Sequence, residues 1–209
     1  MSLETDLEKC SQIMGSSWPK QSREKDFRTN FIYKCYTLDD CLEAIEINNA
    51  LDLKDYALHR WYNKTCSIIC EYMFCDYGAI HETDIYNHDT DIYIDGIPFD
   101  VKLTVYPKQL LNNKLLDITS RQGKNKLLQW LYANQSKENR KQFTNRLYIV
   151  CKGHTYLESI NLKNNFPKIR QKVYKFMEYY NQHKTINTIT VQDGEQQYIV
   201  QSDIIAVFP

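Results

Sequence analysis

Apolar and polar residues alternate most clearly in the middle of the chain. The stretch DTDIYIDGIPFDVKL (89–103) alternates on both sides of the dipeptide Asp95-Gly96. An Asp-Gly pair between two alternating runs is the strongest short-range signal for a β-hairpin with a two-residue turn. The pattern therefore predicts a hairpin in which Ile94 lies opposite Ile97, so that the numbers of paired residues sum to 191.

Longer periodic segments predict the remaining elements. The run 55–78 is rich in large apolar residues and ends at Gly78, which indicates a largely buried helix. Thr37 and Asp40 form a capping-box pattern at the start of an earlier helix. The other expected elements are a loop or arm (15–30), extended pieces (79–86), an amphipathic helix (120–137), a strand (145–153), a basic helix (164–182) and a terminal hairpin (186–208).

The order of these elements predicts an α/β fold with a central mixed β-sheet flanked by helices. We expect a single domain over residues 1–209. It would comprise an N-terminal helical extension and loop (1–54), a core (55–153) and a C-terminal helix and hairpin that complete the fold (154–209). No apolar run approaches the roughly 18 residues that a membrane span needs, so no membrane association is expected.

Cysteine usage and the N-terminus indicate the compartment. Seven cysteines, an odd number, fit a reducing environment, and the acidic, polar start MSLETDLEKC does not resemble a signal peptide. The cytoplasm is therefore the expected location. Cys66 and Cys70 lie one helical turn apart, but the close pairs and fourth ligand of an iron–sulfur cluster are missing, so we interpret them as small apolar helix residues.

Charge is balanced overall but unevenly distributed. The chain has 26 basic and 26 acidic residues, yet residues 1–101 contain 9 Lys and Arg against 19 Asp and Glu, whereas residues 102–152 contain 11 against 2. A basic middle on a neutral chain fits a phosphate-binding face. The alternative interpretation is a pair of well-solvated helices.

The predicted hairpin brings acidic residues together on one face. Asp91 would face Asp100, and Asp89 would face Lys102, while the opposite face is apolar. Opposed carboxylates repel each other, and a divalent cation between them removes the conflict. Oxygen ligands of this kind suit Mg²⁺ or Mn²⁺. Lys102 would share the face and stabilise charge on a phosphate or orient an attacking water, which together make a site for phosphodiester hydrolysis.

The string Asp91, then Asp100-Val101-Lys102, resembles the signature of the PD-(D/E)XK nuclease superfamily, and the predicted element order over 55–153 is similar to its restriction-endonuclease-like core. The resemblance implies a metal-dependent hydrolase, an endonuclease or another nuclease, that cuts DNA with Asp91, Asp100 and Lys102. It adds Glu71 on the first core helix as an auxiliary metal ligand, and phosphate contacts from the helix after the motif. Members that cleave both strands are often homodimers. The candidate phosphate-binding residues are Arg121, Gln122, Lys124 and Lys126.

Several alternatives stay open. Thr90 stands where the superfamily name has proline, and Glu71 also fits a polar position on a buried helix. Asp89 is a reserve ligand, or an ordinary ion-pair partner of Lys102. His59, His81 and His88 show no zinc spacing and are not interpreted as ligands. A non-catalytic member of the same fold would use the basic segment to bind nucleic acid or a protein.

Overall fold

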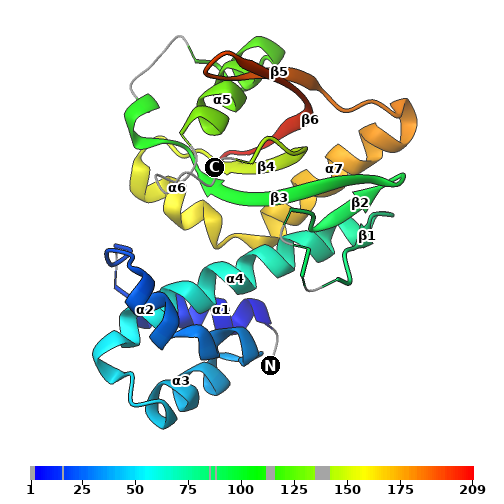
Figure 1. Ribbon diagram of the computed structural model, residues 1–209. Coiled ribbons are helices and arrows are strands. Elements are labelled where there is room, and N and C mark those ends of the chain that lie inside the picture. The colour runs from blue at the N-terminus through cyan, green and yellow to red at the C-terminus, as the bar shows by residue number, and fades with distance from the viewer. Residues whose placement is uncertain (1–2, 16, 85, 88, 112–115, 135–141) are drawn as a thin grey trace. The chain divides into compact units, whose positions relative to one another are not determined.

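The computed structural model describes residues 3–15, 17–84, 86–87, 89–111, 116–134 and 142–209 (Figure 1). It contains two compact units, Met1–Ile69 and Cys70–Pro209, each described by itself. Helix α4 (Lys54–Cys75) contributes residues to both units.

The first unit is helical. Its helices are α1 (Leu3–Ile13), α2 (Arg23–Arg28), α3 (Leu38–Ile47) and the first part of α4, with short 3₁₀ turns η1 (Asn30–Lys34) and η2 (Leu51–Leu53). The predicted capping box is confirmed, because Thr37 Oγ1 accepts from the Asp40 N–H while the Thr37 N–H donates to Asp40 Oδ2. The segment 15–30, expected to be a loop, contains α2, which begins after Ser22 caps the Lys25 N–H.

The second unit is built on one six-stranded mixed sheet with the order β1-β2-β3-β4-β6-β5. The neighbours β1–β2, β2–β3 and β5–β6 are antiparallel, whereas β3–β4 and β4–β6 are parallel. The predicted α/β class with a mixed sheet is confirmed. The strands are β1 (Ile80–His81), β2 (Ile92–Ile94), β3 (Ile97–Val105), β4 (Arg146–Cys151), β5 (Thr188–Asp193) and β6 (Gln196–Val207).

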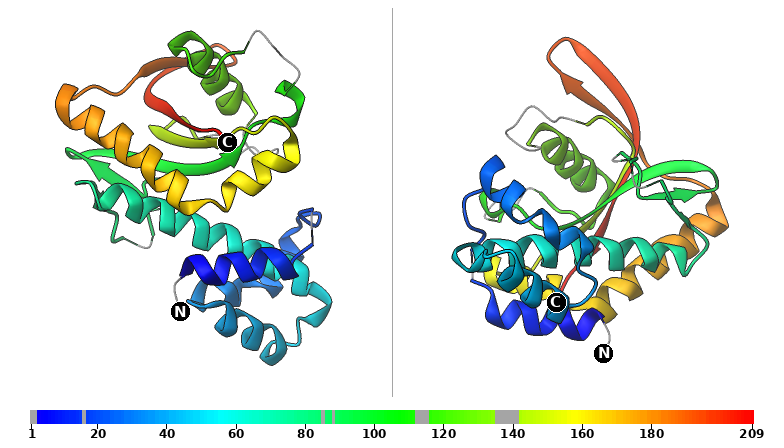
Figure 2. Two further views of the ribbon diagram at one scale, coloured as in Figure 1. Left: turned by 180° about the vertical axis from the view of Figure 1, so that it is seen from behind. Right: turned by 60° about the horizontal axis from the view of Figure 1, so that its bottom comes forward.

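Helices cover both faces of this sheet (Figure 1). Helix α5 (Arg121–Ala133) packs against β5 and β6, α6 (Tyr156–Lys163) against β3 and β4, and α7 (Phe166–His183) against β6. A 3₁₀ turn, η3 (Lys108–Leu110), follows β3. Helix α5 lies within the expected range 120–137, of which residues 135–137 are outside the described residues. Figure 2 shows the β5–β6 hairpin extending past the other strands.

The predicted hairpin register is confirmed from the turn as far as Ile92. Ile94 pairs with Ile97 and Ile92 with Phe99, and both turn residues, Asp95 and Gly96, have positive φ (48° and 80°), as a type I′ turn requires. The ladder then departs from the expected pairing, because the Asp91 N–H donates to the Phe99 carbonyl at 2.9 Å.

The expected opposed pairs Asp91–Asp100 and Asp89–Lys102 are therefore wrong as ladder pairs, because β2 begins only at Ile92. The first strand is also shorter than predicted. It comprises Ile80 and His81 rather than 79–86.

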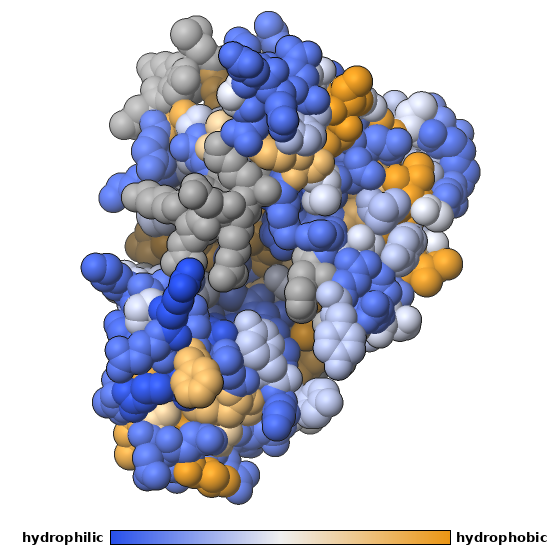
Figure 3. All heavy atoms as spheres, in the orientation of Figure 1, coloured by the Kyte–Doolittle hydropathy of each residue, from blue (hydrophilic) through white to orange (hydrophobic). Residues whose placement is uncertain are grey.

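A buried apolar cluster lies between α5 and the sheet. It includes Leu127, Leu128 and Tyr132 of α5 and Tyr148 and Ile204 of the strands, and Trp130 is packed against it. Among the described residues, no helix combines the length and apolar character needed to cross a membrane. The face in Figure 3 is mostly hydrophilic, with hydrophobic side chains scattered over it.

Candidate active site

Asp100 is the centre of the candidate site. It lies in β3, and its side chain is only 3% exposed. The Lys102 ammonium, two residues on and therefore on the same face of the strand, lies 2.5 Å from Asp100 Oδ1. The Arg146 Nε lies 2.6 Å from Asp100 Oδ2, because the parallel pairing of β3 with β4 places Arg146 directly beside Asp100.

Arg146 was not found by the sequence analysis, although it is the most buried cation of the site, with a side chain 6% exposed. Its Nη2 donates to Gln142 Oε1 at 2.6 Å, and its Nη1 donates to the Tyr148 hydroxyl at 3.4 Å. Gln142 in turn donates to Asp89 Oδ1 at 2.6 Å. Asp89 thus supports the arginine through Gln142 and is not an ion-pair partner of Lys102.

Asp91, the residue directly before β2, also lies near Asp100 and Lys102. Its Oδ2 accepts from the Val101 N–H at 2.7 Å, so the carboxylate replaces the strand carbonyl that β2 no longer supplies. Burial, with smaller contributions from the Glu71 and Asp100 charges, raises the pKa of Asp91 to about 7, although the nearby Lys102 opposes the shift. The structure therefore places Asp91, Asp100 and Lys102 within electrostatic reach of one another.

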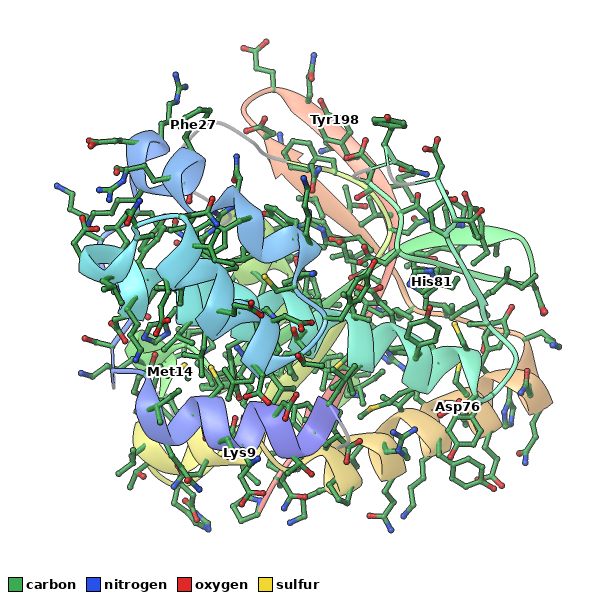
Figure 4. All side chains as sticks on the ribbon, turned by 90° about the horizontal axis from the view of Figure 1, so that it is seen from below. Lys9, Met14, Phe27, Asp76, His81 and Tyr198 are labelled. Atoms are coloured by element: carbon green, nitrogen blue, oxygen red, sulfur yellow. The ribbon has the colours of Figure 1, made fainter. Side chains whose placement is uncertain are left out.

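Glu71 joins this group from α4. Burial raises the pKa of Glu71, and this is partly offset by a hydrogen bond from His81 and by the Lys102 charge. The His81 Nε2 lies 2.9 Å from Glu71 Oε2, and its ring stacks on Tyr72 with centroids 4.8 Å apart. Figure 4 shows His81 on β1 beside the C-terminal part of α4. His81, which the sequence did not indicate as a ligand, thus contacts Glu71 of the candidate site.

The other two histidines, His59 and His88, add nothing to the candidate site. His59 lies 3.7 Å from Asp55 within the helical unit, and His88 lies outside the described residues.

The charges and oxygen ligands of this group bear on a divalent cation. Three carboxylates, Glu71, Asp91 and Asp100, face two cations, so the group has an excess of negative charge once all three are ionised. Asp100 Oδ2 is buried and has no hydrogen-bond partner, since the Arg146 Nε beside it is out of line for a hydrogen bond. A buried carboxylate oxygen without a hydrogen bond, in a group with more acids than bases, fits a hard cation, although the Arg146 Nε lies 2.6 Å from it.

Mg²⁺ usually takes only one or two protein carboxylates and fills its other positions with water and phosphate oxygens. Asp91 and Asp100 are enough for such a site, with Glu71 as auxiliary. Within the part of the chain that the structure describes, no group of three or more His, Cys, Asp or Glu side chains is arranged to hold a metal ion. Because Lys102 and Arg146 already lie beside the two Asp100 oxygens, a metal ion bound to Asp100 would compete with one of these cations.

The predicted phosphate-binding residues of α5 divide into two pairs. Arg121 Nη1 donates to Asp203 Oδ2 at 2.8 Å, and Lys124 Nζ lies 3.7 Å from Asp203 Oδ1. These two cations are paired with a buried acid of β6. Gln122 and Lys126 are exposed on α5.

Comparisons with family models, with curated proteins and with solved structures give no significant match to this chain.

Proposed function

We propose that this protein is a metal-dependent nuclease that hydrolyses phosphodiester bonds, with DNA as the expected substrate. The observation that carries the proposal is the convergence of Glu71, Asp91 and Asp100 with Lys102 at the middle of β3. A buried cluster with an excess of carboxylates and an adjacent lysine suits a divalent cation and a phosphate. The resemblance to the PD-(D/E)XK superfamily agrees with these residues and remains a prediction.

Each residue has a role in this proposal. Asp91 and Asp100 would hold Mg²⁺ or Mn²⁺, assisted by Glu71, and the bound ion would supply a water of lowered pKa and neutralise phosphate charge. The Lys102 ammonium is half exposed, so it can reach a phosphate oxygen and stabilise the charge that develops there. Arg146 fixes the orientation of the Asp100 carboxylate, and His81 does the same for Glu71.

The test compares the wild type with Asp100→Asn and Lys102→Ala on plasmid and oligonucleotide substrates in Mg²⁺, Mn²⁺ or EDTA. We expect cleavage by the wild type with metal only, and a loss on the order of 100-fold or more in each variant. Asp39→Asn, an exposed acid on α3, is the control for the loss of one charge. Cleavage that is equal in all four proteins would overturn the proposal.

A readout independent of activity is the effect of the ion on stability. A cation that binds the folded state raises the melting temperature by mass action. We expect Mn²⁺ to stabilise the wild type and the Asp39→Asn variant, and to lose this effect in Asp100→Asn. Circular dichroism of each variant establishes that it is folded.

One observation favours a second function, a non-catalytic domain that binds nucleic acid or a protein. Both oxygens of Asp100 already have a cation within 2.6 Å, as in a purely structural ion network. Under this alternative, Asp100→Asn loses stability but keeps full DNA binding, no metal effect is seen, and binding weakens with salt.

A further inference from the structure

The C-terminal half of β6 borders a cavity. Strand β5 pairs only with residues 196–201 of β6, and Ser202 donates to the Asn187 carbonyl just past the end of the ladder. Beyond Ser202, no described strand pairs with this edge of β6. Residues of α5, of α7 and of this end of β6 line an open cavity of about 380 Å³. This volume lies within the range of small-molecule sites.

The cavity wall is strongly basic. Four cations line it, two from the first turns of α5 and two from the middle of α7: Arg121, Lys124, Lys172 and Lys175. The acid among the lining residues is Asp203. Its carboxylate is engaged on three sides, by Arg121 at 2.8 Å, by Lys124 at 3.7 Å and by the Ile204 N–H at 2.7 Å. Asp203 therefore anchors the α5 cations and leaves the wall with a net positive charge.

Lys172 and Lys175 complete the cationic wall from the opposite side. Neither lysine has an acidic partner among the described residues, and Lys172 is half-buried. Like charges that converge on one cavity repel each other, so this arrangement is stabilised when an anion lies between them. The N-terminus of α5 adds a partial positive charge on the side of Arg121 and Lys124. A phosphate group has the charge and the number of acceptor oxygens that this wall suits.

The rest of the wall is aromatic and aliphatic. Phe176 and Tyr179 of α7 and Phe208 after β6 line the cavity, together with Ile204 and Ile205. Tyr179 is 53% exposed although its ring stacks on His183 at 4.1 Å, so it is available for a further ring. Aromatic side chains next to cations are the combination that binds a nucleobase and its phosphate.

We propose that this cavity binds a nucleoside phosphate, with the phosphate between the α5 and α7 cations and the base against Tyr179, Phe176 and Phe208. The ligand is either a free nucleotide or the terminal nucleotide of a strand, since both present the same chemistry. The inference does not depend on the acid cluster around Asp100.

The test is isothermal titration of the whole protein, in EDTA, with adenosine 5′-monophosphate, adenosine and inorganic phosphate. We expect adenosine 5′-monophosphate to bind at least about 10-fold more tightly than either fragment, because each fragment lacks one half of the contacts. Lys172→Gln/Lys175→Gln should weaken its binding at least about 10-fold, and Tyr179→Ala should weaken the nucleotide but not phosphate. Lys168→Gln, on the same helix but outside the cavity, is the matched control.

Two further arms separate the sources and the two proposals. A 5′-phosphorylated oligonucleotide that binds more tightly than adenosine 5′-monophosphate, and than its 5′-hydroxyl form, assigns the site to a strand end. The reverse order assigns it to a free nucleotide. Asp100→Asn should leave nucleotide affinity unchanged, so a failure of the nuclease proposal does not affect this result. Equal binding of phosphate and nucleotide, or no effect of the double variant, would overturn the inference.

Discussion

The Asp91 carboxylate accepts a hydrogen bond from the Val101 N–H at 2.7 Å, at the point where the pairing of β2 with β3 stops. The same carboxylate belongs to the acid cluster with Glu71 and Asp100. The same hydrogen bond fixes the orientation of the carboxylate toward Glu71 and Asp100. Structure and proposed chemistry therefore depend on one group. Substitutions at Asp91 should be chosen to keep the hydrogen-bond acceptor while changing the charge.

Asp91→Asn should change the pH dependence of stability. The folded-state pKa of Asp91 is raised to about 7, above the ordinary value of roughly 3.9. Between these values the unfolded chain releases a proton that the folded chain keeps, so the free energy of unfolding falls as pH rises, by at most about 1.4 kcal/mol per pH unit. The contribution is complete below about pH 4 and is lost as pH passes about 7.

The measurement for Asp91 is urea unfolding of the wild type and Asp91→Asn in EDTA at several pH values between about 4 and 8. The stability of the wild type relative to the variant should fall with pH and then level off. Asp39→Asn provides the exposed control. A difference that stays constant over the whole range would contradict the raised pKa.

His81→Ala should destabilise the fold. The substitution removes the 2.9 Å contact with Glu71 and leaves a buried carboxylate without this partner, which costs about 1–3 kcal/mol. It also raises the pKa of Glu71 further, since His81 opposes the effect of burial. Chemical unfolding at about pH 7 should show this loss. Tyr72→Leu, which removes only the ring stack, should show a smaller loss.

Gly123→Ala should destabilise the protein although it lies in a helix. An alanine in a helix interior is normally favoured over glycine by about 1 kcal/mol. At position 123 the added Cβ would lie 1.7 Å from the Asp117 carbonyl oxygen, so the backbone must shift. We expect a net loss of at least about 2 kcal/mol in thermal unfolding. Gln122→Ala, at the exposed neighbouring position, should change stability by less than about 0.5 kcal/mol.

Cysteine alkylation should be selective in the native state. Burial raises the pKa of Cys10 and of Cys41 to about 12, so neither forms the reactive thiolate at neutral pH. Cys75 is less buried, although burial raises its pKa as well. Peptide mapping after brief treatment with iodoacetamide should find Cys75 modified well before Cys10 or Cys41. Simultaneous modification of all three would indicate global opening instead.

The sequence predicted what depends on neighbouring residues. The Asp95-Gly96 turn sets the hairpin register by local backbone geometry, and the pairs next to the turn follow from it. The departure at Asp91 was not predictable, because it depends on where β2 begins and on a carboxylate that accepts a backbone hydrogen bond in place of a strand carbonyl. Helix α6 did carry a local signal. Thr155 precedes it, and its side chain accepts a hydrogen bond from the Glu158 N–H, so the T-x-x-E pattern marks the start of this helix.

Arg146 and Asp203 were missed for another reason. Asp100 and Arg146 are 46 residues apart in the sequence, and they meet only because β3 and β4 pair in one parallel register. Strand order and register between distant strands have no signature in a single sequence. In the same way, the pairing of Arg121 and Lys124 depends on Asp203 in the last strand, 82 residues beyond Arg121.

Helix α4 limits how this chain can be divided into fragments. A fragment that started at Cys70 would retain only six residues of α4, Cys70 to Cys75, and so short a peptide does not hold a helical conformation alone. Glu71 would then sit at a frayed end. Truncations intended for crystallisation or for binding studies should therefore begin before Lys54, so that the whole 22-residue helix is expressed.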